Sequence, residues 1–166
     1  MRRGAARIVL AVLTIALLVL IWVMSDQPAD RSDDMSLGVG RYIGRVFMSG
    51  FDKLDEAEQT GYAQKIDPTV RKTAHFAEYF LLGLLLCGDA HAWRLEGAAG
   101  VVLPVAFGVL CAAIDELHQL FVPGRAGMWQ DVLLDSAGVA AGCAFMLFVV
   151  FLLRKHKKKK KDPVAG

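Results

Sequence analysis

The sequence predicts an all-α protein that crosses a membrane several times. Of its 166 residues, 55% are hydrophobic and the mean hydropathy is +0.41, which is too apolar for an ordinary soluble domain. The net charge of +2 conceals an asymmetry, because basic residues gather at both ends of the chain. They are Arg2, Arg3 and Arg7 near the N-terminus, and Arg154, Lys155 and Lys157 to Lys161 near the C-terminus. Because basic flanks favour the cytoplasmic side, both termini are predicted to be cytoplasmic.

Four segments can be drawn as membrane spans, and an even number of crossings agrees with two cytoplasmic ends. The predicted spans are 5–24, 68–87, 97–122 and 128–153, in one membrane domain of residues 1–153 followed by a basic cytoplasmic tail of residues 154–166. Asp67 and Pro68 suit the cap and first residue of the second helix, and Pro104 predicts a kink in the third. Since the tail adjoins a span, we interpret it as an anchor that contacts anionic lipid, not nucleic acid.

The predicted extracytoplasmic segment, residues 25–67, contains an amphipathic helix. Apolar residues recur in it at helical spacing from Val39 to Leu54, with Arg41, Arg45 and Asp52 on the opposite face. Such a helix could lie in the membrane interface on the extracytoplasmic side, close over the bundle as a lid, or pack only for stability. The sequence leaves these alternatives open.

Polar residues of the last three spans are predicted to meet near the outer surface of the membrane. At about 1.5 Å per residue, Glu78, Asp115 and Asp135 each lie roughly 10–15 Å inside their predicted helix ends. The candidate site residues are Arg71, Lys72, His75, Glu78 and Tyr79 on the second span, Asp115, Glu116, His118 and Gln119 on the third, Arg125 in the following loop, and Asp131 and Asp135 on the fourth.

This group of residues has more acids than bases. Its five carboxylates and three basic side chains give a charge of −2 before His75 and His118 are counted. A buried cluster must be neutralised, and protonated histidines, one divalent metal ion, or two acids kept neutral by desolvation would each achieve this. Beside the cluster, Gly138 and Gly142 form a GxxxG pattern, which favours close packing within the molecule.

The chemistry available to such a site is acid–base catalysis, metal binding and anion binding. The candidates for proton transfer or metal ligation are His75, Glu78, Asp115, Glu116 and His118. Basic side chains near the outer interface could bind a phosphate or pyrophosphate. The predicted substrate-binding set is Arg71, Lys72, Tyr79, Gln119, Arg125, Asp131 and Asp135. The spacing of the histidines does not match that of zinc proteases, and no nucleotide fingerprint occurs.

Three stretches of the sequence resemble the VanZ-like family of small bacterial membrane proteins. They are "RKTAHFAEYFLLGLLL" (71–86), "DELHQLFVPGR" (115–125) and "DVLLDSAGVAAG" (131–142), and "SDQP" after the first span is also similar. The resemblance implies a multi-pass protein of the bacterial cytoplasmic membrane. The founding member of that family is associated with low-level resistance to the glycopeptide teicoplanin. The resemblance supplies no settled reaction.

The sequence predicts a protein that binds an amphiphilic envelope component, with or without chemically altering it. The predicted site is a polar pocket near the extracytoplasmic surface of the cytoplasmic membrane. A lipid-linked cell-wall precursor fits this description, since its tail would stay among the membrane lipids while its head group reached the polar residues. The alternative is a non-catalytic accessory protein whose buried ion pairs only stabilise the helix bundle. Enzymatic activity, the metal and the oligomeric state stay open.

Overall fold

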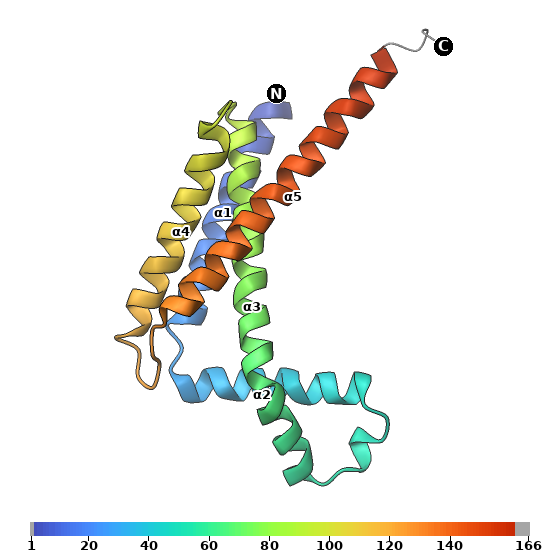
Figure 1. Ribbon diagram of the computed structural model, residues 1–166, viewed down its shortest axis with the longest axis vertical. Helices are drawn as coiled ribbons and strands as arrows, with labels where there is room; N and C mark the ends of the chain where they lie inside the picture. The colour runs from blue at the N-terminus through green and yellow to red at the C-terminus, as the bar shows by residue number, and fades with distance from the viewer. Residues whose placement is uncertain (1, 162–166) are drawn as a thin grey trace.

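The computed structural model describes the backbone of residues 2–161 and the side chains of residues 4–156. Within that range the only regular elements are helices, which confirms the predicted all-α class (Figure 1). They are α1 (Arg2–Ser25), α2 (Ala29–Phe47), the short 3-10 helix η1 (Phe51–Lys53), α3 (Glu56–Ala92), α4 (Ala99–Gln119) and α5 (Trp129–Lys161). The side chains of Arg2, Arg3 and the tail lysines from Lys157 onward lie outside the described residues.

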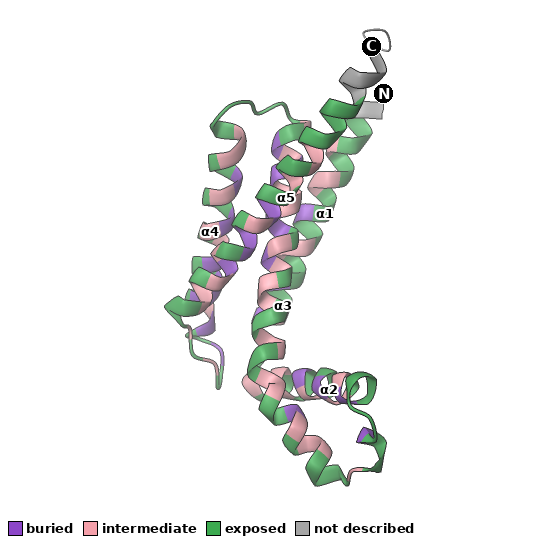
Figure 2. Ribbon diagram, turned by 45° about the vertical axis from the view of Figure 1, so that its right-hand side comes forward, coloured by how far each residue is buried: buried purple, intermediate pink, exposed green. Residues whose placement is uncertain are grey.

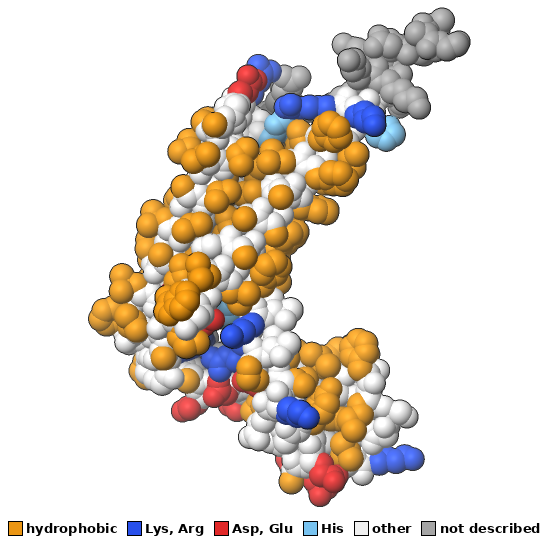
Figure 3. All heavy atoms as spheres, viewed as in Figure 1, with side chains coloured by type: hydrophobic (Ala, Val, Ile, Leu, Met, Phe, Trp, Pro, Cys, Tyr) orange, Lys and Arg blue, Asp and Glu red, His pale blue; other side chains and the backbone are white. Residues whose placement is uncertain are grey.

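Three helices are long and apolar enough to cross a membrane, in the part of the chain that the structure describes. Their apolar stretches are Gly4–Ser25, Ala99–Gln119 and Trp129–His156. Figure 3 shows a belt of hydrophobic side chains over the bundle, with charged side chains at both ends of the belt. Large side chains such as Phe107, Leu110 and Phe148 are exposed in this belt. Since soluble proteins rarely expose so much contiguous apolar surface, the chain is a membrane protein.

α3 extends well beyond the helix that the sequence predicted. The prediction that this helix starts at Asp67 and Pro68 is wrong, because a capping box starts it after Asp55. The Asp55 carboxylate accepts from the Glu58 N–H at 2.8 Å, and the Glu58 carboxylate accepts from the Asp55 N–H at 3.1 Å. Pro68 lies inside the helix, at an exposed position where water can reach the carbonyl group that it leaves unpaired.

The first turns of α3 therefore project out of the bundle. A helix of 37 residues is about 55 Å long, whereas the hydrocarbon core of a bilayer is about 30 Å thick. Together with α2 and η1 these turns form an arm, and α2 crosses α3 and runs out sideways from the end of the bundle (Figure 1). The arm corresponds to residues 25–67, the segment that the sequence predicts to be extracytoplasmic.

α2 packs on α3 through small residues rather than through its large apolar ones. Ser36, Gly40 and Gly44 are its buried residues, and a Cβ on Gly40 would lie 3.1 Å from that of Ala63. The predicted continuation of one amphipathic pattern as far as Leu54 is wrong, because α2 ends at Phe47. Gly50, with φ of 83°, then reverses the chain.

The reversal after α2 leaves its large apolar side chains uncovered. Phe51 returns to pack against Gly44, while Val39, Tyr42 and Val46 stay exposed. A helix at the end of the bundle with an uncovered apolar face has the form of an interfacial helix.

The bundle consists of α1, α3, α4 and α5, with the start of α1 and the end of α5 at the same end (Figure 1). Buried residues line the inner sides of these helices, and the outer sides are exposed (Figure 2). The core includes Tyr79 and Leu82 of α3, Ala112 of α4, and Val139 and Cys143 of α5. The corner between α1 and α2 and the loop between α4 and α5 lie together at the other end, where the Ala29 N–H donates to the carbonyl of Pro123 at 3.1 Å.

Glycines allow α3 and α5 to touch backbone to backbone. A Cβ added to Gly142 would clash with the carbonyl oxygen of Phe80, and one on Gly138 would lie 2.7 Å from the carbonyl oxygen of Phe76. From the other side, a Cβ on Gly83 would clash with the Val139 carbonyl. The GxxxG pattern thus lies in a contact within the molecule, and this contact fixes the position of α5 against α3.

Replacing Gly142 by valine should separate these two helices. The added side chain has no space beside Phe80, so we expect a loss of at least about 1–3 kcal/mol in the free energy of unfolding, measured by thermal unfolding in detergent. Ala140→Val adds bulk at an exposed position of the same helix and is the matched control. Equal stability of the two variants would contradict the observed contact.

Candidate functional site

Four ionisable side chains from three helices meet inside the bundle. His75 comes from α3, Asp115 and Glu116 from α4, and Asp135 from α5. One ligand atom of each lies within 4.8 Å of those of the other three. The relative exposure is 0% for Asp135 and 4% for Asp115 and Glu116, so the carboxylates are removed from solvent. These four residues are called the buried cluster below.

The positions of the buried cluster follow from how its helices pack. Asp135 lies one turn before Val139 on α5. Val139 packs against Gly83 of α3 and Gly108 of α4, so Asp135, on the same face of α5, also faces these two helices. Asp115 lies three residues after the buried Ala112, on the same face of α4. Because α4 ends at Gln119, earlier than predicted, Asp115 lies about 6 Å inside the helix end, and Asp135 lies about 9 Å inside the start of α5.

Most polar atoms of the buried cluster lack a hydrogen-bond partner. Both carboxylate oxygens of Asp115 and of Asp135, Oε1 of Glu116 and Nδ1 of His75 are buried without one. His75 Nδ1 lies 3.7 Å from Asp135 Oδ2, which is an ion-pair distance but not a hydrogen bond. The exception is Glu116 Oε2, which accepts from the Met128 N–H at 2.8 Å. Unpaired buried acceptors are rare in proteins and call for an explanation.

His118 and Gln119 contact α1 and not the buried cluster. His118 Nε2 lies 3.0 Å from Asp26 Oδ1, and its ring stacks on that of Trp22 with 4.3 Å between centroids. Gln119 donates to the hydroxyl of Ser25 at 3.2 Å. Both side chains therefore link the last turn of α4 to the end of α1.

Two arginines lie where the arm joins the bundle. Arg125 donates to the carbonyl oxygens of Gln27 at 3.1 Å and Met24 at 3.4 Å, so it fixes the corner between α1 and α2. Arg71 forms an ion pair with Asp33 of α2. Both arginines line one cavity, where burial, and then the positive charge of Arg71, lower the pKa of Arg125.

Two cavities reach the buried cluster. The first, of about 210 Å³, lies between α1, α2 and α3 and is lined by Arg71, His75, Glu78, Asp115 and Arg125, with Met24, Met35 and Val39 on its apolar side. The second, of about 320 Å³, lies between α1, α3 and α4 and has an almost wholly apolar lining that includes Tyr79. Ile21 and Asp115 line both cavities, so the two cavities are neighbours. The first is called the polar cavity below, because it contains the charged side chains of Arg71 and Arg125 as well as apolar ones.

The remaining candidate residues lie in different surroundings. Lys72 is exposed and faces a shallow hollow beside Leu134, outside both cavities. Asp131 is half-buried, and its Oδ1 has no hydrogen-bond partner. The hydroxyl of Tyr79 is buried and also unpartnered. The structure thus brings together most of the candidates predicted from the sequence, but it does not bring Lys72 to the first cavity.

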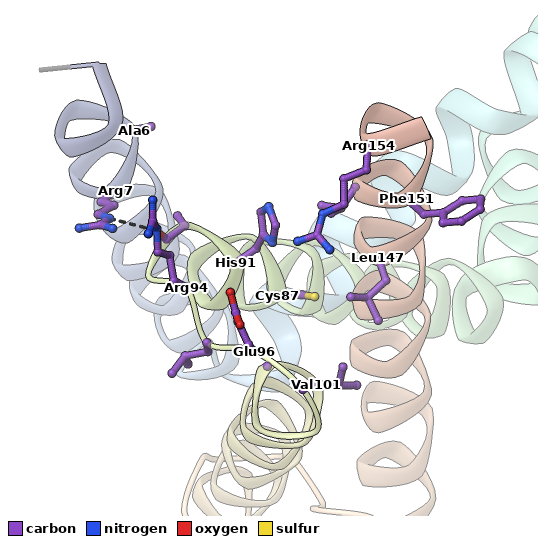
Figure 4. Close-up of a pocket in the computed structure, with 15 residues that line it drawn as sticks. Ala6, Arg7, Cys87, His91, Arg94, Glu96, Val101, Leu147, Phe151 and Arg154 are labelled. Carbon is purple, nitrogen blue, oxygen red and sulfur yellow. Dashed lines mark hydrogen bonds between the residues drawn. The ribbon is translucent and has the colours of Figure 1, made fainter. Parts of the chain in front are cut away.

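A larger cavity at the opposite end of the bundle was not expected from the sequence. It measures about 810 Å³, and Arg7, His91, Arg94 and Arg154 project around it from α1, the α3–α4 corner and α5 (Figure 4). Arg7 donates to the carbonyl of Ala92 at 2.9 Å and lies over the Trp93 ring. The sequence places these arginines in separate flanks of the spans, so no local pattern could have revealed the cavity.

Comparison with known families agrees with this geometry. The VanZ/LLP1 family model matches residues 10–153. The chain belongs to the VanZ/LLP1 family. No curated protein and no solved structure matches it. The matched range of this VanZ/LLP1 chain includes the arm, the buried cluster and both cavities that reach it.

Proposed function

We propose that the protein crosses the bacterial cytoplasmic membrane four times, with both termini in the cytoplasm. α3 supplies the fourth crossing, since its second half runs between the other helices of the bundle (Figure 1). Basic residues at the end of the bundle that carries the termini, among them Arg7, Arg94 and Arg154, support this orientation. Acidic residues of the arm, such as Asp30, Asp33 and Asp55, lie beyond the other end.

We further propose that the outer end of the bundle binds an amphiphilic, lipid-linked envelope component. The observation that carries this proposal is the meeting of the two cavities at Asp115. The apolar cavity suits a hydrocarbon tail, which would enter from the bilayer between α1 and α4. The polar cavity suits an anionic head group such as a phosphate, because Arg71 and Arg125 both line it.

The residues of the polar cavity divide into two roles under this proposal. Arg71 and Arg125, both in the substrate-binding set predicted from the sequence, neutralise and orient the head group. Lys72, from the same set, lies outside this cavity and has no part in binding. His75 and Glu78 lie beside the same space, and groups of these types can transfer protons to a bound ligand. By extension from the family's founding member, the protein contributes to low-level teicoplanin resistance.

A purely structural role for the buried cluster is the second candidate. The Glu116–Met128 hydrogen bond and the His75–Asp135 contact each join neighbouring elements, which favours it. Removing one partner of a buried charge pair destabilises a protein by roughly 3–5 kcal/mol. On this view substitutions would reduce binding only by reducing the amount of folded protein in the membrane.

The topology can be tested with single cysteines in a chain whose native cysteines are replaced by alanine. Ser49→Cys in the arm and Ala126→Cys in the α4–α5 loop should react with a membrane-impermeant maleimide on intact cells, because the proposal places both outside. Glu96→Cys in the α3–α4 corner should react only after the cells are permeabilised. All three positions are exposed in the structure. The reverse pattern of labelling would contradict the proposed orientation.

Head-group binding can be tested with a polyprenyl pyrophosphate added to the protein in nanodiscs. Arg125→Gln should weaken binding by about tenfold or more, because it removes a charged donor from the polar cavity. Arg94→Gln, at the opposite end of the bundle, is the matched control and should bind normally. Membrane abundance is measured for both variants, since a loss of binding in proportion to abundance would favour the structural role. Normal binding by abundant Arg125→Gln would contradict the proposal.

A further inference from the structure

We propose that the buried cluster is a binding site for one divalent metal ion, with His75, Asp115, Glu116 and Asp135 as its protein ligands. These residues offer one ring nitrogen and three carboxylate oxygens. The inference does not depend on the lipid-binding proposal, because it rests only on the geometry and burial of these four side chains.

The spacing of the ligand atoms suits a metal ion. Nitrogen and oxygen ligands lie about 2.0–2.2 Å from a zinc ion, so two ligands on opposite sides of an ion are about 4.4 Å apart at most. The four atoms of the buried cluster are all within 4.8 Å of one another. This upper bound is close to the span of one coordination shell, and rotation of the side chains would draw the four atoms toward a shared ion.

A bound cation would balance charge that the described basic side chains leave unpaired in the buried cluster. Among the described residues, no lysine or arginine nitrogen lies within the 4.0 Å ion-pair distance of Asp115, Glu116 or Asp135. His75, when protonated, could balance only one of these three carboxylates. A divalent ion would balance two while His75 stays neutral as a ligand, which reduces the large unfavourable energy of burying carboxylates.

The hydrogen bonds around the buried cluster leave unpaired the carboxylate oxygens that would bind an ion. Glu116 uses Oε2 to accept from the Met128 N–H, which holds the carboxylate in place, and Oε1 has no partner. Asp135 is fully buried and has two unpartnered oxygens. Metal ligands are commonly oriented by such outer contacts, and unpaired acceptors in a closed interior are what a bound cation would satisfy.

The donor set also narrows the class of ion. Carboxylates suit Mg²⁺, Ca²⁺ and Mn²⁺, whereas imidazole favours the transition metals, so the mixed set indicates an ion such as Mn²⁺, Fe²⁺ or Zn²⁺. His75 and Asp115 line the polar cavity, which gives a small ligand or water access to the ion. Such access is typical of metal sites that bind substrates and is absent from closed structural sites.

The test is the metal content of tag-free protein purified in detergent without chelators, measured by mass spectrometry. We expect about one transition-metal ion per chain in the wild type, and a loss of at least about tenfold in Asp135→Asn and His75→Ala. Asp89→Asn and His91→Ala are matched controls at the opposite end of the bundle and should retain the ion. Asp89 instead accepts a hydrogen bond from Thr14.

A second measurement covers the case in which Asp135→Asn or His75→Ala does not accumulate. Wild-type protein is treated with EDTA, dialysed, and titrated with Mn²⁺ or Zn²⁺ while its Tm is followed. A rise in Tm that saturates near one equivalent supports the site, because an ion bound only by the folded state stabilises it. A metal-free wild type whose Tm neither ion raises would overturn the inference. Equal metal content in Asp135→Asn and Asp89→Asn would also overturn it.

Discussion

The burial of three carboxylates and one imidazole among three apolar helices is the constraint on which the rest of this structure depends. A single charged side chain inside a membrane is unfavourable by about 2.5–3.5 kcal/mol or more, so these groups need one another or a shared cation. The buried cluster lies near the end of α4 and the start of α5, where the α4–α5 loop donates the Met128 N–H and the cavity lined by Arg71 and Arg125 begins. Its position therefore combines burial among apolar helices with access from a cavity.

Close helix packing is what allows residues far apart in the sequence to share this space. Gly83, Gly138 and Gly142 let the backbones of α3 and α5 touch, and Gly108 admits the Val139 side chain from α5. Leu82, Ala112 and Cys143 fill the interior next to this contact. The same packing leaves openings beside α1, which is joined to α4 by contacts at its end rather than by an interlocked face. Those openings are the cavities that reach Asp115.

The sequence predicted the convergence of the polar residues because helical periodicity and hydrophobic segments set which faces turn inward. The sequence misplaces the start of α3, although Asp55 and Glu58 form a recognisable capping box, because Asp67 and Pro68 also have the residue types of a helix start. It could not predict that α2 would pack through Ser36 and its glycines, since that depends on the reversal at Gly50. Helical spacing already places Arg71 on one stripe with His75 and Glu78 and puts Lys72 beside it, and the structure has Arg71 in the cavity with those two residues and Lys72 outside it.

A double-mutant cycle between His75 and Asp135 tests most directly whether the buried cluster is one interacting unit. The free energy of unfolding in detergent is measured for the wild type, His75→Gln, Asp135→Asn and the double variant. Groups that share one buried network, whether by ion pairing or through a common ion, should show a coupling of about 1 kcal/mol or more, with the double variant less destabilised than the sum of the single ones. Additive effects, within about 0.5 kcal/mol, would contradict the account.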